Sequence, residues 1–240
     1  MTWNDPATEF DGRRTPAPID MIRLSYSHHE DYYDDGDDGP QFWNVSADIY
    51  DLEGRGQLEH VGDFEFVRFD PYETRDLFGV LDGHDGDLGL MAETLLDPGS
   101  GNYREDLEEF TEPIYSGMLI LNRAKLEKPW QGFGLGVLLT ARAIRKLSPG
   151  CRGIACFPAP ISGGPTNPDD KETRPLAIAT LGEVWEQIGF EHYRDGVFVL
   201  NLGTVTLEEQ ITALGSRVAK IPQISEDEYL DAIDAAEEAE

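Results

Sequence analysis

The chain has 240 residues, enough for one large domain, and its 40% hydrophobic and 10% aromatic content predicts that most of it folds. Its 47 acidic and 19 basic residues give a net charge of −28, which disfavours nucleic acid and anionic membranes as partners and favours cationic ones, including a basic protein. Charge alone does not separate a solubility adaptation from an acidic docking surface or a mimic of nucleic acid.

Cysteine usage and hydropathy together predict a cytoplasmic protein. The two cysteines, Cys151 and Cys156, lie five apart without metal-ligand spacing, which favours a reduced compartment over a disulfide scaffold. Residues 1–14 contain no apolar run, so we expect no signal peptide. No stretch of the chain approaches the roughly 20 apolar residues that a membrane span needs.

The first half of the chain predicts an antiparallel meander followed by helices. Residues 1–18 have no periodicity and are expected to form a flexible arm, and the acidic loop 28–40 matches neither calcium nor zinc ligand spacing, so we expect no metal there. Alternating apolar residues predict strands, two of them joined as a hairpin through the glycines of 53–56. The expected strands are 20–29, 41–52 and 57–70, and the expected helices 70–81, 86–97 and 104–113.

The second half alternates strands and helices. A strand, a helix and another strand in succession predict a right-handed crossover and a parallel pair, and Asp195–Gly196 predicts a closing hairpin. The loop 161–175 is long enough to serve as a lid. The expected strands are 115–128 and 152–160, the helices 134–150 and 176–190, and the hairpin 190–203.

These elements predict an α/β (mixed α+β) fold, with a central mixed sheet, flanking helices and an N-terminal antiparallel meander. One domain is expected over 19–205, followed by a C-terminal helix and a helix-prone acidic tail over 206–240. No internal repeat is found. The oligomeric state, a homodimer included, is left open.

A glycine-rich turn, "QGFGLG" (131–136), connects an expected strand to an expected helix. The free N–H groups and the dipole of a helix N-terminus attract phosphates, and glycines permit close approach. The turn lacks the lysine and threonine of a P-loop and differs from the dinucleotide fingerprint. It lies in a segment, 123–152, that holds seven basic residues and a single acidic one, Glu127. The turn therefore predicts a site for a phosphate-bearing ligand.

This turn resembles the acyl-CoA signature of the GNAT superfamily of acyl-CoA-dependent N-acyltransferases, which reads Gln or Arg, two residues, Gly, one residue, then Gly or Ala. The lead-in "KLEKPW" (125–130) is similar to the family's, and "VWEQIGFEHYRDGVFVLNL" (184–202) resembles its second landmark, an aromatic residue before a Gly-Phe pair and a hairpin. The resemblance covers about residues 115–203. The first half departs from it, because the family places two helices after its first strand.

The resemblance implies the cofactor-binding residues. The backbone of Leu126 and its strand neighbours would hold the pantetheine arm of acetyl-CoA or another acyl-CoA. The side chain of Gln131 and main-chain N–H groups of the turn would hold the pyrophosphate. The implied set is Leu126, Gln131, Gly132, Gly134, Leu135, Gly136 and Val137. Arg142, Arg145 and Lys146 are candidates for outer phosphates, and solvation of a helix end explains them equally well.

The catalytic residues are not assigned. Many family members place a tyrosine, which protonates the leaving thiolate, where this chain has Trp185. An indole N–H donates hydrogen bonds but is not an acid at neutral pH. Another group or water then protonates the thiolate, or the protein binds acyl-CoA without turning it over. His60, Asp63 and Glu65 are candidates for a general base, although polar residues on a half-exposed sheet explain them better. Tyr193 and His192, nearby in the sequence, are further candidates for a catalytic role, although a position lining the hairpin explains them better.

The sequence thus predicts an N-acyltransferase that moves an acetyl or other acyl group from acyl-CoA to an amine of a cationic substrate, without a metal. Two alternatives stay open. One is a non-catalytic acyl-CoA-binding protein on the same fold. The other is an acidic interaction protein or nucleic-acid mimic.

Overall fold

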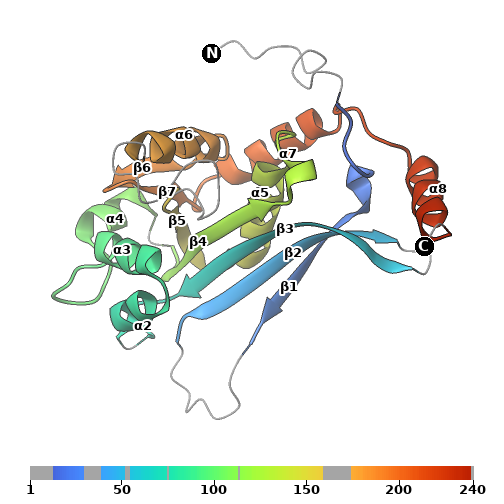
Figure 1. Cartoon of the computed structure of the whole chain (residues 1–240). Coiled ribbons are helices and arrows are strands. Elements are labelled where there is room, and N and C mark those ends of the chain that lie inside the picture. The colour runs from blue at the N-terminus through green and yellow to red at the C-terminus, as the bar shows by residue number, and fades with distance from the viewer. Residues whose placement is uncertain are drawn as a thin grey trace.

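The computed structural model describes residues 13–29, 39–51, 55–74, 76–112, 114–158 and 174–238 (Figure 1). Their strands form one mixed seven-stranded sheet in the order β1-β2-β3-β4-β5-β7-β6. This confirms the predicted mixed α/β class. Most of the acidic loop and of the predicted lid lies outside the described residues.

The N-terminal strands form the predicted antiparallel meander. β1 (Ile22–His28) pairs with β2 (Gln41–Asp51), and β2 pairs with β3 (Gly56–Phe69). Half-buried and exposed residues alternate along β1, as expected for an edge strand with one apolar face. Register shifts after Ala47 and Ile49 in β2 add local twist to the hairpin.

Three helices follow the meander: α2 (Leu77–His84), α3 (Gly86–Leu95) and α4 (Glu105–Phe110). The prediction that the first of them starts at residue 70 was wrong. Residues 71–73 form turns, and the helix begins after Asp76, which has left-handed backbone (φ 45°) and accepts a hydrogen bond from the Gly79 N–H. Aspartate is one of the few residues that tolerates this conformation.

The second half follows the predicted alternation. β4 (Gly117–Leu126) pairs antiparallel with β3 and parallel with β5 (Cys151–Cys156), which ends earlier than predicted. A hairpin of β6 (Glu191–Arg194) and β7 (Val197–Asn201) completes the sheet, with left-handed residues at Asp195 and Gly196. The connecting elements are the 3₁₀ turn η2 (Lys128–Trp130), α5 (Leu135–Leu147) and α6 (Arg174–Glu186).

The two faces of the sheet build separate cores. One core joins the sheet to α5 and to α7 (Thr206–Val218), and Phe64, Phe66 and Trp130 are its largest fully buried side chains. The other joins the opposite face to α2, α3 and α4. No helix among the described residues is both long and apolar enough to cross a membrane.

The segment before β1 and the segment after α7 are fastened to each other. The Thr15 N–H donates to the Pro222 carbonyl (3.1 Å), the Ile19 N–H donates to the Gln223 side chain (2.9 Å), and Arg14 pairs with Glu228 (3.4 Å). Residues 13–18, which were assigned to the arm, are therefore packed, and the η1 turn (Ile19–Met21) leads from them into β1. α8 (Glu226–Glu237) lies beside the tip of the β2–β3 hairpin, as Figure 1 shows.

Candidate functional site

The strand end that leads into the glycine turn is anchored in the core. Pro129 is the middle residue of the 3₁₀ turn η2, and Trp130 ends the turn with a side chain that is fully buried. The indole N–H of Trp130 donates to a carboxylate oxygen of Glu59 on β3 (2.8 Å). The backbone that enters the turn is thus anchored to the core and to β3 through Trp130.

The turn itself needs glycine at two positions. Gly132 has φ +86° and Gly134 has φ +74°, in the left-handed region that other L-residues enter at a cost of about 1–2 kcal/mol. A Cβ on Gly134 would meet nothing within 4 Å, so the space in front of this residue is open. Gly136, by contrast, faces the Leu126 side chain, where a Cβ would make ordinary contact.

The turn presents main-chain donors at the start of α5. Gly134 is the N-cap and has no side chain with which to accept from the first amides of the helix. The N–H groups of Leu135, Gly136 and Val137 therefore have no acceptor within the helix. The side chains of Leu135 and Val137 are buried, so these two predicted residues can contribute only their backbone. Three amides and a helix dipole at one open point suit an anion.

Gln131 has a different place from the one predicted. Its side-chain nitrogen donates to the Leu126 carbonyl (2.8 Å), which closes the end of β4. An amide nitrogen carries two hydrogens, so one donor of Gln131 is left for a ligand. The structure brings Leu126 and Gln131 together, although as partners of each other.

Arg13 lies at the turn and was missed in the sequence analysis. Its guanidinium stands 5.2 Å from the centre of the Phe133 ring, and a Cβ added to Gly132 would come within 3.1 Å of it. Arg13 lies about half the chain length before the turn in sequence, in a segment without periodicity, so no pattern indicates which part of the fold it contacts. No sequence signal pointed to it.

The basic segment is less available for ligands than its charge suggested. Four of its seven basic side chains form ion pairs: Arg123 with Glu65, Lys125 with Glu127, Arg145 with Glu208, and the buried Arg152 with Glu108. Arg142 and Lys146 are exposed, about 9–15 Å along α5 from Gly136 at 1.5 Å per residue. The charge around the turn thus comes mainly from the helix end and from Arg13 and Lys128.

Next to the turn, β4 continues beyond its parallel partner. The β4–β5 pairing ends at Leu121 and Cys156, whereas β4 runs on to Leu126, and among the described residues only β3 pairs with it there. A β-bulge falls at this point, because Glu65 pairs with Arg123 and Phe66 with Leu121, which leaves Asn122 as the extra residue. The β5 side of residues 122–126 is a strand edge inside the sheet, whose N–H and C=O groups have no partner on β5.

The candidate general bases occupy two different positions on β3. The ring nitrogens of His60 lie 2.8 Å from a carboxylate oxygen of Asp48 and 3.0 Å from one of Asp63. The hydrogen bond to Asp48, opposed by partial burial and aided by Asp63, raises the pKa of His60. Both ring nitrogens of His60 are thus engaged by carboxylates, and neither is open to a substrate.

Glu65 is the candidate nearest in register to the end of the β4–β5 pairing. Its carboxylate accepts hydrogen bonds from the Asn122 side chain (3.2 Å) and from Arg123 (3.3 Å). It is about one-third exposed and therefore accessible from solvent. Asp63 also pairs in register with this part of β4, at Lys125, but its carboxylate contacts His60, whereas Glu65 contacts side chains of β4 itself.

The residues considered as acids have structural partners. Trp185 is half-buried and packs against Phe190, with ring centres 6.3 Å apart. The Tyr193 hydroxyl donates to Asp106 (2.7 Å), and burial, followed by Asp106, raises the pKa of this phenol. His192 stacks edge-on against Phe198. Cys151 and Cys156 are both buried, and burial raises the pKa of both thiols, which disfavours the thiolate that a nucleophile requires.

Among the described residues, no three His, Cys, Asp or Glu side chains are grouped so that they could hold a metal ion. Comparisons of the chain with protein-family models, with curated proteins and with solved structures found no match.

Proposed function

We propose that the chain is a GNAT-like N-acyltransferase that transfers an acetyl or other acyl group from acyl-CoA to the amine of a cationic substrate. The observation that carries the proposal is the turn at Gly134, where α5 offers uncapped amides beside the open edge of β4. The amides suit the pyrophosphate of acyl-CoA. The strand edge suits the amide-bearing pantetheine arm, which can add to β4 as a further strand does.

The proposed reaction is a direct transfer. The neutral amine nitrogen attacks the thioester carbonyl, the new C–N bond forms as the C–S bond breaks, and the proton that the nitrogen loses on becoming an amide passes through water to the leaving thiolate. Main-chain N–H groups at the free edge of β4 would polarise the carbonyl, and positioning of the two substrates would supply much of the rate. Glu65, which pairs in register with Arg123 of this part of β4, would receive the proton that a cationic amine must lose before it attacks.

A second candidate is an acyl-CoA-binding protein without turnover. The observation that favours it is the absence of an acid where the family places its tyrosine. Trp185 occupies that position, and the hydroxyl of the nearby Tyr193 is bound to Asp106. Water would have to protonate the thiolate in an active enzyme.

Gly134→Asp tests the binding proposal without relying on a folding defect. Asp76 already caps α2 from the same left-handed backbone conformation, so an aspartate at position 134 can cap α5 in the same way. The new carboxylate would occupy the anion position and satisfy the amides. We expect the affinity for CoA and for acetyl-CoA, measured by isothermal titration calorimetry, to fall by at least about tenfold.

Gly101→Asp is the matched control. Gly101 has the same φ of +74°, and a Cβ there also meets nothing within 4 Å, but it lies in the α3–α4 connection. This variant should bind CoA as the wild type does. Absence of CoA and acetyl-CoA binding to the wild type at millimolar ligand, or equal binding by Gly134→Asp, contradicts the proposal. Release of free thiol from acetyl-CoA with a panel of amines then separates the enzyme from the binding protein.

A further inference from the structure

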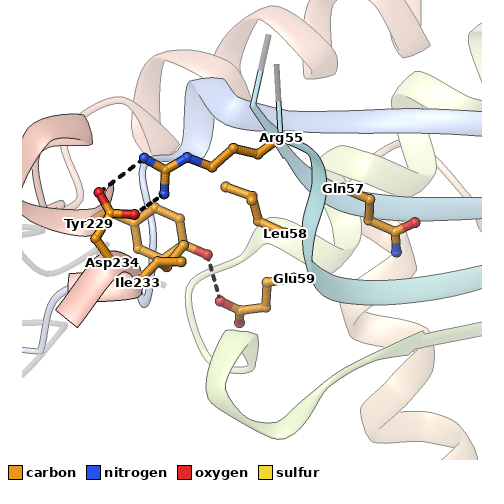
Figure 2. Close-up of a pocket in the computed structure, with 7 residues that line it drawn as sticks. All are labelled: Arg55, Gln57, Leu58, Glu59, Tyr229, Ile233 and Asp234. Atoms are coloured by element: carbon orange, nitrogen blue, oxygen red, sulfur yellow. Dashed lines mark hydrogen bonds and ion pairs between the residues drawn. The ribbon is translucent and has the colours of Figure 1, made fainter. Parts of the chain in front are cut away.

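A cavity of about 720 Å³ lies between the start of β3 and the C-terminal helix α8, away from the glycine turn (Figure 2). Its volume is in the range of small-molecule sites, roughly 300–1,000 Å³. Strand β3 contributes Leu58 and Glu59, and α8 contributes Tyr229, Ile233 and Asp234. The walls therefore combine apolar, aromatic and acidic groups.

The one cationic side chain that lines the cavity is already neutralised. The guanidinium of Arg55 forms two hydrogen bonds to the Asp234 carboxylate, with N–O distances of 2.5 and 3.1 Å. Its Nε also lies 3.7 Å from the buried Asp51. Figure 2 shows Arg55 and Asp234 closing one side of the cavity. Arg55 thus has no positive charge to spare for an anionic ligand.

Glu59 is hydrogen bonded, but its charge is not paired. Its two carboxylate oxygens accept from the Trp130 indole (2.8 Å) and the Tyr229 hydroxyl (3.1 Å), both neutral donors. Among the described residues, no Lys, Arg or His nitrogen lies within 4 Å of this carboxylate. Of the charged side chains that line the cavity, the two carboxylates, Glu59 and Asp234, outnumber the single guanidinium of Arg55. The cavity therefore carries an excess of negative charge.

We infer that this cavity binds an organic cation with an alkyl chain, a primary alkylammonium. The ammonium group would pair with Glu59 beside the Tyr229 ring, and the alkyl chain would lie on Leu58 and Ile233. A hydrated metal ion fits less well, because it requires several oxygen ligands and gains nothing from apolar walls. An anion would meet the excess of carboxylates.

The inferred site is distinct from the proposed acyl-transfer site and does not depend on it. Glu65 lies six positions further along β3 than Glu59, about 20 Å at 3.3 Å per residue. An amine bound at Glu59 is therefore too far from the open edge of β4 to attack a thioester there. The two sites share only Trp130, which touches Glu59 and precedes the glycine turn.

The inference is tested by titrating the whole chain with hexylammonium, in the absence of CoA. Binding is followed by calorimetry and by the ¹H–¹⁵N signal of the Trp130 indole, assigned with Trp130→Phe. We expect saturable binding, a shift of that signal, and weakening at high salt. Hexan-1-ol and hexanoate, of the same length but neutral and anionic, are expected to bind at least about tenfold more weakly.

Two variants locate the site. Glu59→Gln keeps an acceptor for Trp130 or Tyr229 but removes the charge, and should weaken hexylammonium binding by at least about tenfold. Glu228→Gln removes a carboxylate from the same helix, outside the cavity, where it pairs with Arg14, and should bind as the wild type does. No saturable binding to the wild type, or equal binding by Glu59→Gln, overturns the inference. If Glu59→Gln does not fold, the probes decide: hexan-1-ol binding to the wild type as tightly as hexylammonium also overturns it.

Discussion

Two polar regions of this molecule contrast in how their hydrogen-bonding groups are used. On β2 and β3, His60 lies between Asp48 and Asp63, and Asp48 also accepts from Ser46 and Gln57. At the start of α5, the main-chain amides after Gly134 have no acceptor within the helix. The titratable side chains of the first region are hydrogen bonded to one another, whereas the groups without an acceptor in the second region are main-chain N–H groups.

This contrast teaches that residue type is a weak guide to function when the partners are unknown. The histidine cluster gains hydrogen bonds by folding and contributes to stability. The N-terminus of α5 has no side-chain cap, a feature that contributes about 1 kcal/mol of stability in other helices. Such a loss of stability is tolerated where the uncapped amides bind a ligand. If partners and burial decide the contribution of a residue, the loss of stability on substitution should be largest for the buried Trp130 next to the turn, smaller for the buried Arg152, and smallest for the partly exposed His60.

Trp130→Ala should produce the largest loss of stability. Its fully buried side chain supports the glycine turn from beneath, and removal of a buried tryptophan costs about 3–5 kcal/mol. The free energy of unfolding, measured with urea, should fall by that amount. Trp130→Phe keeps most of the buried surface and should lose less than half as much. An unchanged urea midpoint in Trp130→Ala would show that the turn is not anchored through this residue.

Arg152→Ala should cost about 2–3 kcal/mol, because the buried hydrogen bonds from a charged donor are lost and the Thr111 acceptors are left unsatisfied. The Arg152 side chain is 2% exposed, donates to the Thr111 hydroxyl (2.8 Å) and carbonyl (3.2 Å), and pairs with Glu108. Arg145→Ala removes a guanidinium from an exposed pair with Glu208 and should cost less than about 1 kcal/mol. Equal losses in the two variants would mean that burial does not set the contribution of these charges.

His60→Gln should have the smallest effect, and one that depends on pH. The pKa of His60 is raised in the folded chain by its hydrogen bond to Asp48 and by Asp63, above the value of about 6.5 in the unfolded chain. The stabilisation is therefore fully present below about pH 6.5 and is lost as pH rises through the folded pKa.

The variant should accordingly be less stable than the wild type at pH 6, and the difference should shrink by pH 9. Because His60 is about one-third exposed, the loss should stay below about 1 kcal/mol. Thermal unfolding at the two pH values measures it. A difference that grows with pH would contradict the assignment of a charged His60 between the two carboxylates.

Much of the fold could be predicted because its signals are local. Alternating apolar residues gave the β2–β3 hairpin, and Asp195–Gly196 gave the turn between β6 and β7. The glycines before α5 gave the open helix start. The false start of α2 arose from Pro71, which suits a first helical turn but here lies in a turn that Asp76 separates from the helix.

The contacts that complete the candidate site could not be predicted, because they join distant segments. Arg13 reaches Phe133, and Glu59 meets Tyr229 as well as Trp130. Nor does periodicity indicate where β5 ends relative to β4. This difference in length leaves β4 without a β5 partner after Leu121 in the described part of the chain. Pairing of side chains such as His60 and Asp48 depends on strand register, and register shifts between these strands placed them together.

The fastening of the segment before β1 to the segment after α7 governs the order in which the molecule can assemble. The bond between Ile19 and Gln223 spans 204 residues of chain, and Thr15 and Arg14 depend on Pro222 and Glu228 in the same way. Such contacts form late in folding, because closing so long a loop costs chain entropy before the contacts contribute any stabilisation. During synthesis, residues 14–19 therefore cannot reach their final position until residues 222–228 have been made.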